Sequence, residues 1–524
     1  MKNYVITTAL PYANGNLHLG HFFEATVADI KARYFKLYNK SYVFVSGADS
    51  HGAATTLYCH KNNLNIEEHL NSQYEQHKTS YEYLKVEYTS FSRTNTHLHK
   101  NVVNWCIENL IAYEVTNNIK LFNIKEVESW FDPITEQFLP DRYVVGQCPH
   151  CKVENQYPEI CEYCNKKIEP TEIILPVNTI SKNSVILKKS NHLLLNTTGF
   201  FENLKNYEQL FDNSVKNKIL DPSLLNYESI DISRDKPYYG IEVNKDLFPE
   251  LTHQYYYVWF DAPIGYLTFS FEIWLKNRLA TKELFNSFLQ TVQLEHFIGK
   301  DIAYFHTFLW LNILQRIIYK DKNNLAPVAQ INFHGWLTLN HEKLSKSKGH
   351  SFDLSQFSST QIDALRLYFF SKYDATIHDT ELVEKEIYEG YNQTIVQGLA
   401  NFYARAIKIV NDHNLETSIA WDKSHELLPE YESLLVKGRY KKLHEILRSK
   451  LSDLNSQFQE QALWKENNRE IILETSQRLL LDWYNIYQIY VLVCPDLKEN
   501  IESIFTNKFF HLSERIKPFS LFDK

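Results

Sequence analysis

The opening of the chain carries the pattern that most constrains the fold. Residues 4–10 (YVITTAL) form an apolar run typical of a buried strand, and residues 11–15 hold the turn-forming Pro and Gly. Residues 18–37 follow with apolar side chains at helical spacing, and residues 42–45 form a second apolar run. This order indicates an α/β fold built on a Rossmann-like, doubly wound parallel sheet, which binds ligands at the carboxyl ends of its strands.

The alternation of strands and helices is interrupted once and later gives way to helices alone. Residues 115–225 combine short strand-like pieces, cysteines and polar loops, as an insertion would. Strands are expected to resume at Tyr255–Phe260, Gln293–Ile298 and Gln330–Phe333. Helical spacing then prevails in the segments Ile395–Val410, Tyr431–Gln459 and Glu470–Val493, which predict an α-helical bundle.

Length and charge limit the possible classes. A chain of 524 residues is too long for one core, so we expect domains at 1–114 and 226–330 (two halves of the sheet domain), 115–225 (the insertion), 331–375 (a linking fold) and 376–524 (the bundle). The net charge of −8 excludes a globally basic nucleic-acid binder but leaves a local basic groove open. Neither a membrane-spanning run nor a targeting segment is evident, so we expect a cytoplasmic protein.

Four of the seven cysteines have the spacing of a metal site. Cys148, Cys151, Cys161 and Cys164 form the pattern C-x2-C-x9-C-x2-C. Each C-x-x-C turn can present two thiolates to one tetrahedral Zn²⁺, and four protein ligands leave no open position. The pattern therefore predicts one structural zinc ion per chain, in preference to four unrelated thiols or a disulfide framework.

Two short motifs suit a polyphosphate. His18 and His21 lie one turn apart at the start of the expected helix, where exposed N–H groups favour anions, and Gly20 between them has no side chain to block a nucleotide. Lys343 and Lys346 lie three residues apart in a polar segment and can neutralise the charge that builds on a leaving pyrophosphate. Either motif alone is as well explained by surface histidines or a solvated charged loop.

Together, in this order, the two motifs resemble the signatures of class I aminoacyl-tRNA synthetases. The segments TTALPYANGNLHLGH, DISRDKPYYG, YVWFDAPIGY, HFIGKDIAYFH and HGWLTLNHEKLSKSKG are similar to those of the methionyl-tRNA synthetases. The resemblance runs through essentially the whole chain. It implies a catalytic domain with an inserted zinc knuckle, a helical anticodon-binding domain, and the substrates L-methionine, ATP with Mg²⁺, and tRNA(Met).

The resemblance assigns roles to individual residues. It implies catalytic roles for His18, His21, Lys343 and Lys346, which also bind ATP together with Gly20, Glu24 and Asp301. The residues that it implies for the methionine pocket are Ala9, Leu10, Tyr12, Asp49, Trp259, Ala262, Pro263, Tyr266, Ile302, Phe305, His306 and Trp310. An aromatic and apolar wall suits a thioether, and Asp49 can hold the substrate's ammonium group. From the pattern alone, the aromatic residues would rather be assigned to an ordinary core.

The same resemblance implies that Asn401, Arg405 and Trp464 read the anticodon. Arg and Asn can hydrogen-bond base edges, and an exposed indole can stack on an unstacked base. Leu463 stands where the family typically has Pro, and Leu344 stands where it usually has Met. Without the resemblance, Asn401 and Arg405 would be interpreted as ordinary residues on a helix surface, and Trp464 as a partly buried Trp.

Two other functions remain open at this stage. The chain can be a catalytically altered paralogue that acts as a tRNA-binding or regulatory protein, or a class I ligase for another amino acid. The chain ends soon after the helical region, without the extra C-terminal module that makes some members of the family dimers, so we expect a monomer.

Overall fold

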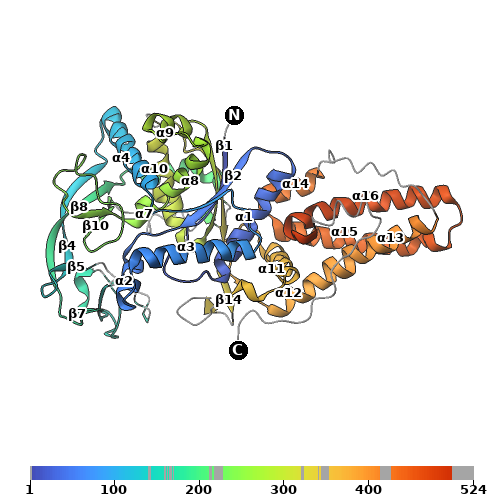
Figure 1. Cartoon of the computed structure of the whole chain (residues 1–524), viewed down its shortest axis with the longest axis horizontal. Helices are drawn as coiled ribbons and strands as arrows, with labels where there is room; N and C mark the ends of the chain where they lie inside the picture. Colours follow the sequence, from blue (N-terminus) through green and yellow to red (C-terminus); the bar gives the residue numbers. More distant parts are fainter. Residues whose placement is uncertain are drawn as a thin grey trace.

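A five-stranded parallel sheet occupies the middle of the molecule (Figure 1). The computed structural model describes residues 3–139, 143–157, 161, 163–164, 168, 170–211, 215–216, 228–319, 324–339, 342–343, 353–413 and 427–497. The strands run in the order β13-β12-β1-β2-β3 and span Asn3–Thr8 (β1), Tyr42–Ala48 (β2), Ser90–Arg93 (β3), Val292–Gly299 (β12) and Val328–His334 (β13). The strand order reverses between β1 and β12, which is where such sheets bind ligands.

Helices cover both faces of this sheet and complete the predicted α/β architecture. They span Leu19–Leu37 (α1), Ala53–Lys61 (α2), Ile66–Tyr83 (α3), His97–Asn117 (α4), Ile264–Leu275 (α8), Lys282–Leu289 (α9) and Leu311–Ile318 (α10). Helix α1 is buried along most of its length, because it packs on the sheet and also joins the apolar core of the helical region. In the described part of the chain, no helix is both long and apolar enough to cross a membrane.

The inserted region lies on one side of the sheet (Figure 1). Four antiparallel strands form its main sheet in the order β5-β4-β8-β9, with bounds Phe122–Asp132 (β4), Gln137–Leu139 (β5), Ile186–Asn196 (β8) and Ser229–Asp231 (β9). A second ribbon pairs β6 (Val144–Gln147) with β7 (Ile174–Asn178) and carries the cysteine cluster. Short helix α5 (Phe200–Leu204) leads the chain back toward the central sheet.

The prediction of a strand at Tyr255–Phe260 is wrong. Strand β11 covers only Gln254–Tyr256 and pairs antiparallel with β10 (Ser233–Asp235), outside the parallel sheet. Residues Val258–Asp261 form the short helix α7 instead. A short apolar run does not distinguish a strand from a buried helical turn. Here Pro263, the N-cap of α8, follows only two residues after the end of α7.

The helical region extends from the other side of the sheet (Figure 1). A small sheet in the order β15-β14-β16 precedes it, formed by Leu337–Leu339 (β14), Glu342–Lys343 (β15) and Thr380–Glu381 (β16). The helices span Ser359–Lys372 (α11), Glu384–Tyr391 (α12), Asn401–Asp412 (α13), Pro429–Val436 (α14), Tyr440–Gln461 (α15) and Arg469–Val493 (α16). The predicted bundle is confirmed, although Gly438 at φ 68° separates α14 from α15 and a π-helix at Asn392–Ala400 precedes α13.

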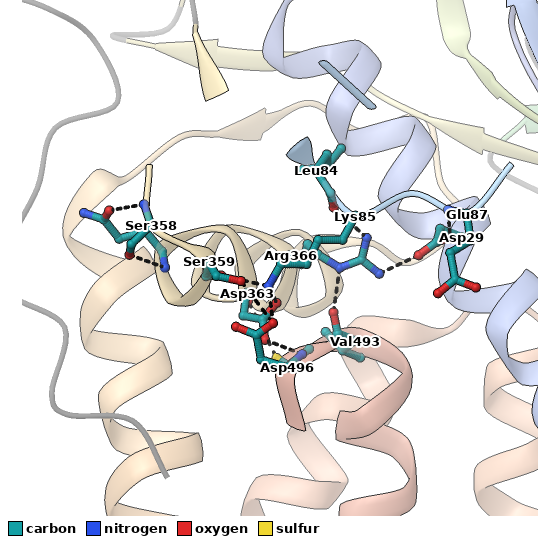
Figure 2. Close-up of polar contacts among 12 residues, drawn as sticks. Asp29, Leu84, Lys85, Glu87, Ser358, Ser359, Asp363, Arg366, Val493 and Asp496 are labelled. Carbon is teal, nitrogen blue, oxygen red and sulfur yellow. Dashed lines mark hydrogen bonds and ion pairs between the residues drawn. The ribbon is translucent and has the colours of Figure 1, made fainter. Parts of the chain in front are cut away.

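A buried ionic network joins the bundle to the sheet domain. Figure 2 shows the Arg366 guanidinium on α11 between Asp29 of α1 and the end of α16. Its Nη2 lies 2.6 Å from the Asp29 carboxylate, and its Nε donates to the Val493 carbonyl at 2.8 Å. Because Arg366 and Asp29 are both fully buried, removal of either would leave an uncompensated buried charge. The network therefore fixes the relative positions of α1, α11 and α16.

A second buried ionic cluster lies in the insertion. His192 on β8 is held between two carboxylates, with Nδ1 2.6 Å from Asp231 and Nε2 2.8 Å from Asp235. Burial disfavours the charged imidazolium, but the hydrogen bonds to these carboxylates outweigh it and raise the pKa of His192 to about 9. The imidazolium therefore links β8 to β9 and β10.

We expect His192→Gln to remove a pH-dependent part of the stability of the insertion. The folded pKa lies above the unfolded value of about 6.5, so this stabilisation is complete below that pH and is lost as the pH rises through about 9. The shift corresponds to about 3 kcal/mol. Hydrogen exchange of β8 amides across this pH range would measure this stabilisation. His97→Gln is the control, because His97 is exposed. Equal pH slopes in wild type and His192→Gln would contradict the expectation.

Candidate active site

A cavity of about 390 Å³ opens where the strand order reverses. Its walls come from the ends of β1, β2, β12 and β13, the start of α1, and the α7–α8 junction. The lining residues are Ala9, Leu10, Pro11, Tyr12, His18, Gly20, His21, Glu24, Asp49, Trp259, Ala262, Pro263, Tyr266, Gly299, Asp301, Ile302, His306, His334, Gly335, Trp336 and Leu337. Most residues predicted for the methionine and ATP sites are therefore brought together in one cavity.

The two histidines lie side by side at the start of α1. His18 is the N-cap rather than a residue of the first turn, and its Nδ1 accepts the Gly20 N–H at 3.1 Å. The His21 Nδ1 in turn accepts the His18 N–H at 3.1 Å, and the two rings stack at 3.8 Å. Since both Nδ1 atoms accept, each neutral ring carries its proton on Nε2, which can donate to a phosphate oxygen. A Cβ on Gly20 would lie 2.9 Å from the His18 ring, so only glycine permits this arrangement.

Asp49 places a buried carboxylate in the cavity. Its backbone pairs with the segment after β1, with the Ala13 N–H donating to the Asp49 carbonyl at 2.9 Å, and this brings Tyr12 beside it. The Asp49 residue is 3 % exposed. Burial, and then the charge of nearby Asp261, raise the pKa of Asp49 well above its usual range. Such a carboxylate gains most from a ligand that brings a positive charge.

Two imidazoles hold Asp261 behind Asp49. The His51 Nδ1 lies 2.6 Å from the Asp261 carboxylate, and the His99 Nε2 lies 3.5 Å from it. Burial raises the pKa of Asp261, but His51 and His99 outweigh that effect and keep the pKa below its usual value. His51 and His99 therefore stabilise the charge on Asp261, which does not line the cavity. Asp49 is the carboxylate of this pair that faces the ligand.

Aromatic side chains form the apolar wall. Trp259 stacks flat on Phe305 with ring centroids 3.8 Å apart, and Tyr12 meets Trp259 edge-on at 6.5 Å. Phe305 itself does not line the cavity but supports Trp259 from behind. Trp310 also lies behind the wall, where it is buried and donates its indole N–H to the His296 Nε2 at 3.2 Å.

A neutral polar pair closes the apolar end. The His306 Nδ1 lies 3.1 Å from the Ile302 carbonyl, which can only accept, so Nδ1 carries the proton. The His306 Nε2 then accepts the hydroxyl of Tyr266 at 2.9 Å. Burial lowers the pKa of His306 to about 4, so the ring is uncharged at neutral pH. This end suits a weakly polar, uncharged group such as a thioether.

Residues His334 to Leu337 also line the cavity and were missed in the sequence. The His334 Nε2 lies 3.0 Å from one oxygen of Glu24, while the other oxygen accepts the Ala9 N–H at 2.7 Å. Burial lowers the pKa of His334, but Glu24 outweighs this effect and raises it. Glu24 therefore joins β1, α1 and β13 around the cavity. The segment HGWLTLN, which is part of the family resemblance, is the sequence signal that could have identified these residues.

The predicted lysines are only partly described. Strand β15 ends at Lys343 and pairs antiparallel with β14, with Lys343 opposite Thr338. Thr338 follows Leu337, which lines the cavity, so the backbone of the lysine segment starts beside the cavity. Lys346 and Leu344 lie outside the described residues.

The four cysteines come together in the insertion. Their Sγ atoms all lie within 4.8 Å of one another, with separations of 3.8 Å for Cys148–Cys164 and 3.7 Å for Cys151–Cys161. A tetrahedron of thiolates about 2.3 Å from Zn²⁺ has edges of about 3.8 Å. The backbone N–H groups of His150 and Cys164 also donate to Cys148 and Cys161 at 3.4 Å, which favours thiolates. The donor set fits zinc.

The three predicted anticodon residues lie together on the helical bundle. Asn401 and Arg405 are one turn apart on α13, and Trp464 follows α15 with 48 % of its surface exposed. Leu463 is 1 % exposed, so an apolar side chain anchors the backbone beside Trp464 where the family typically has Pro. The bundle and the insertion lie on opposite sides of the sheet (Figure 1).

Comparisons with known proteins agree with this architecture. A family model described as tRNA synthetases class I (M) matches residues 4–407. The methionine–tRNA ligase of Buchnera aphidicola (strain APS) is 30% identical over 526 residues, covering 97% of this chain and 92% of that protein. The methionine–tRNA ligase of Francisella tularensis (strain SCHU S4) is 33% identical over 410 residues, covering 77% of this chain and 58% of that protein.

A solved structure shows the same fold. Mycobacterium tuberculosis methionyl-tRNA synthetase in complex with methionyl-adenylate superposes with a TM-score of 0.70 at 18% identity, covering 95% of this chain and 93% of that chain. The family model and the sequence relatives thus extend over most of the chain. The chain belongs to the methionine–tRNA ligase family of class I tRNA synthetases.

Proposed function

We propose that this chain is a methionine–tRNA ligase that forms methionyl-adenylate from L-methionine and ATP and transfers the methionyl group to tRNA(Met). The observation that carries the proposal is the composition of one cavity. It combines the buried Asp49 carboxylate, an apolar wall closed by neutral His306, and two imidazoles at a helix N-terminus. These parts match an amino acid with an ammonium group, a thioether side chain and a neighbouring polyphosphate.

The amino-acid half of the cavity selects by charge and polarity. Asp49 binds the ammonium group, since the added positive charge restores an ionised carboxylate in a buried position. The side chain lies against Trp259 and ends near Tyr266 and His306, which are neutral and already hydrogen-bonded to each other. Among the described residues, no counter-charge lies at this end, so a charged side chain is disfavoured there.

The ATP half acts by position and charge. Gly20, Glu24 and Asp301 hold the nucleotide, whose Mg²⁺ arrives bound to its phosphates. A methionine carboxylate oxygen attacks the α-phosphorus, the bond to the bridging oxygen breaks, and pyrophosphate leaves. His18, His21, Lys343 and Lys346 stabilise the charge that develops on the phosphates. The terminal ribose 2′-hydroxyl of tRNA then attacks the methionyl carbonyl, loses its proton, and AMP leaves.

The other predicted sites support this activity from a distance. Zn²⁺ on Cys148, Cys151, Cys161 and Cys164 stabilises the insertion, and Asn401, Arg405 and Trp464 bind the anticodon. A monomeric enzyme in the cytoplasm stays part of the proposal, and sedimentation at micromolar concentration tests the oligomeric state.

Amino-acid-dependent ATP–pyrophosphate exchange tests the proposed activity. We expect exchange with methionine and with no other proteinogenic amino acid, followed by methionylation of tRNA(Met). Exchange that depends on another amino acid would support a different class I ligase. Binding of tRNA without exchange for any amino acid would support a regulatory paralogue.

Asp49→Asn is expected to weaken methionine binding strongly. The substitution preserves shape and leaves Oδ1 able to accept the His51 N–H, but it removes the counter-charge for the ammonium group. Loss of one partner of a buried ion pair costs about 2–5 kcal/mol, so the KM for methionine should rise by about 30-fold to 4,000-fold. The KM for ATP in the same exchange assay is the internal control. Equal rises in both KM values would argue against a direct contact with methionine.

A further inference from the structure

Three contacts within the helical bundle hold the Arg405 side chain in one place. Its Nη2 donates to the Asn455 side-chain oxygen across the gap between α13 and α15. Its guanidinium carbon lies 4.9 Å from the centre of the Phe458 ring, and its Nε donates to the Asn401 carbonyl at 3.4 Å. A long side chain that would otherwise sample many rotamers is therefore fixed from three directions.

The orientation of Asn455 is set by its own helix. Its Nδ2 donates to the carbonyl of Leu451, one turn earlier on α15, at 2.8 Å. The amide oxygen of Asn455 must then point away from that carbonyl and toward Arg405. If the amide were reversed, its NH2 group would face the guanidinium, and both groups are donors. Asn is a poor residue for the interior of a long helix, so local helix stability does not explain its presence here.

Phe458 connects Arg405 to Trp464. It lies three residues after Asn455 on the same face of α15, is 2 % exposed, and packs against Phe402 of α13 at 5.6 Å. Its ring centre lies 5.9 Å from that of Trp464, whose own backbone is anchored by buried Leu463. The guanidinium and the exposed indole thus rest on the same buried ring.

We propose that Asn455 is a positioning residue that, with Phe458, fixes Arg405 beside Trp464 as a preformed platform for an unstacked anticodon base. This inference rests on the proposed function, in which Arg405 and Trp464 contact the anticodon. Planar guanidinium and indole groups bind a splayed base by stacking and by hydrogen bonds to its edge. Fixing both groups before binding reduces the conformational entropy that is lost on binding.

A double-mutant cycle tests this role. The variants are Asn455→Ala, Arg405→Ala and the double variant, and the probe is a tRNA transcript with the CAU anticodon. Asn455→Ala should raise the KM for tRNA about tenfold, the size expected for a lost hydrogen bond to a charged group. In the Arg405→Ala background, Asn455→Ala should change the KM for tRNA less than about twofold, because Asn455 acts through Arg405. Gln457→Ala, on the same helix but bonded to Arg478, is the matched control and should leave the KM unchanged.

The outcomes separate this inference from the proposed function. An unchanged KM for tRNA in Arg405→Ala would remove the anticodon assignment itself. If Arg405→Ala raised the KM for tRNA and Asn455→Ala left it unchanged, only the positioning role of Asn455 would be overturned. An equal rise from Asn455→Ala in both backgrounds would show that Asn455 acts independently of Arg405, and this would also overturn it. Methionine-dependent exchange, which needs no tRNA, reports that each variant is folded.

Discussion

Replacing Cys161 with Ser is expected to remove zinc and to unfold the ribbon formed by β6 and β7. The apolar core of this region is small, and it consists of Leu57, Trp130, Leu139, Tyr143, Val144, Cys148, Cys161, Ile168, Ile173 and Val185. A core of this size rarely holds a fold without a metal or a disulfide. Structural zinc contributes about 10–16 kcal/mol in small zinc-binding peptides, comparable with the roughly 5–15 kcal/mol that stabilises a whole domain.

Two measurements together report the effect. Atomic absorption should show loss of the single zinc per chain, and mass spectrometry should show fast amide exchange confined to β6, β7 and their connection. Cys59→Ser is the matched control, because Cys59 is also buried but lies outside the group of four thiols. A Cys161→Ser protein that kept one equivalent of zinc and slow exchange would rule out a metal-dependent ribbon.

The local pattern of the sequence predicted the sheet better than it predicted the walls of the cavity. The strands at residues 4–10 and 42–45 and the helix at 18–37 are confirmed to within three residues at each end, because each is a continuous element whose apolar period is read directly. The place of the cavity followed from topology, since the loops after β1 and β12 meet where the strand order reverses. The grouping of the cysteines followed from their spacing alone.

The remaining details depend on pairs of residues that are distant in the chain. His306 and Trp310 lie in the same π-helix, Phe305–Trp310. His306 lines the cavity, whereas the indole of Trp310 donates to His296 of strand β12. The pairing of His334 with Glu24 joins residues far apart in the chain, and no local period records such a contact.

Lys346→Ala is expected to slow methionyl-adenylate formation about 10²–10³-fold, the usual loss when one group that stabilises transition-state charge is removed. The negative charge on the leaving pyrophosphate grows only as the bond to the α-phosphorus breaks. The KM for methionine should therefore stay nearly constant while kcat for exchange falls. Lys343 pairs with Thr338, the neighbour of cavity-lining Leu337, and Lys346 follows Lys343 by three residues in the sequence.

Lys348→Ala separates a specific role of Lys346 from a general loss of charge. Lys348 follows two residues later in the same segment, so its removal changes the net charge equally. A long-range electrostatic effect would slow both variants to a similar extent and would weaken at higher salt. A contact with the leaving group predicts instead that only Lys346→Ala loses kcat, and that added salt does not restore it. Parallel losses in the two variants would show that the segment acts by its summed charge, and Lys346 would then have no individual catalytic role.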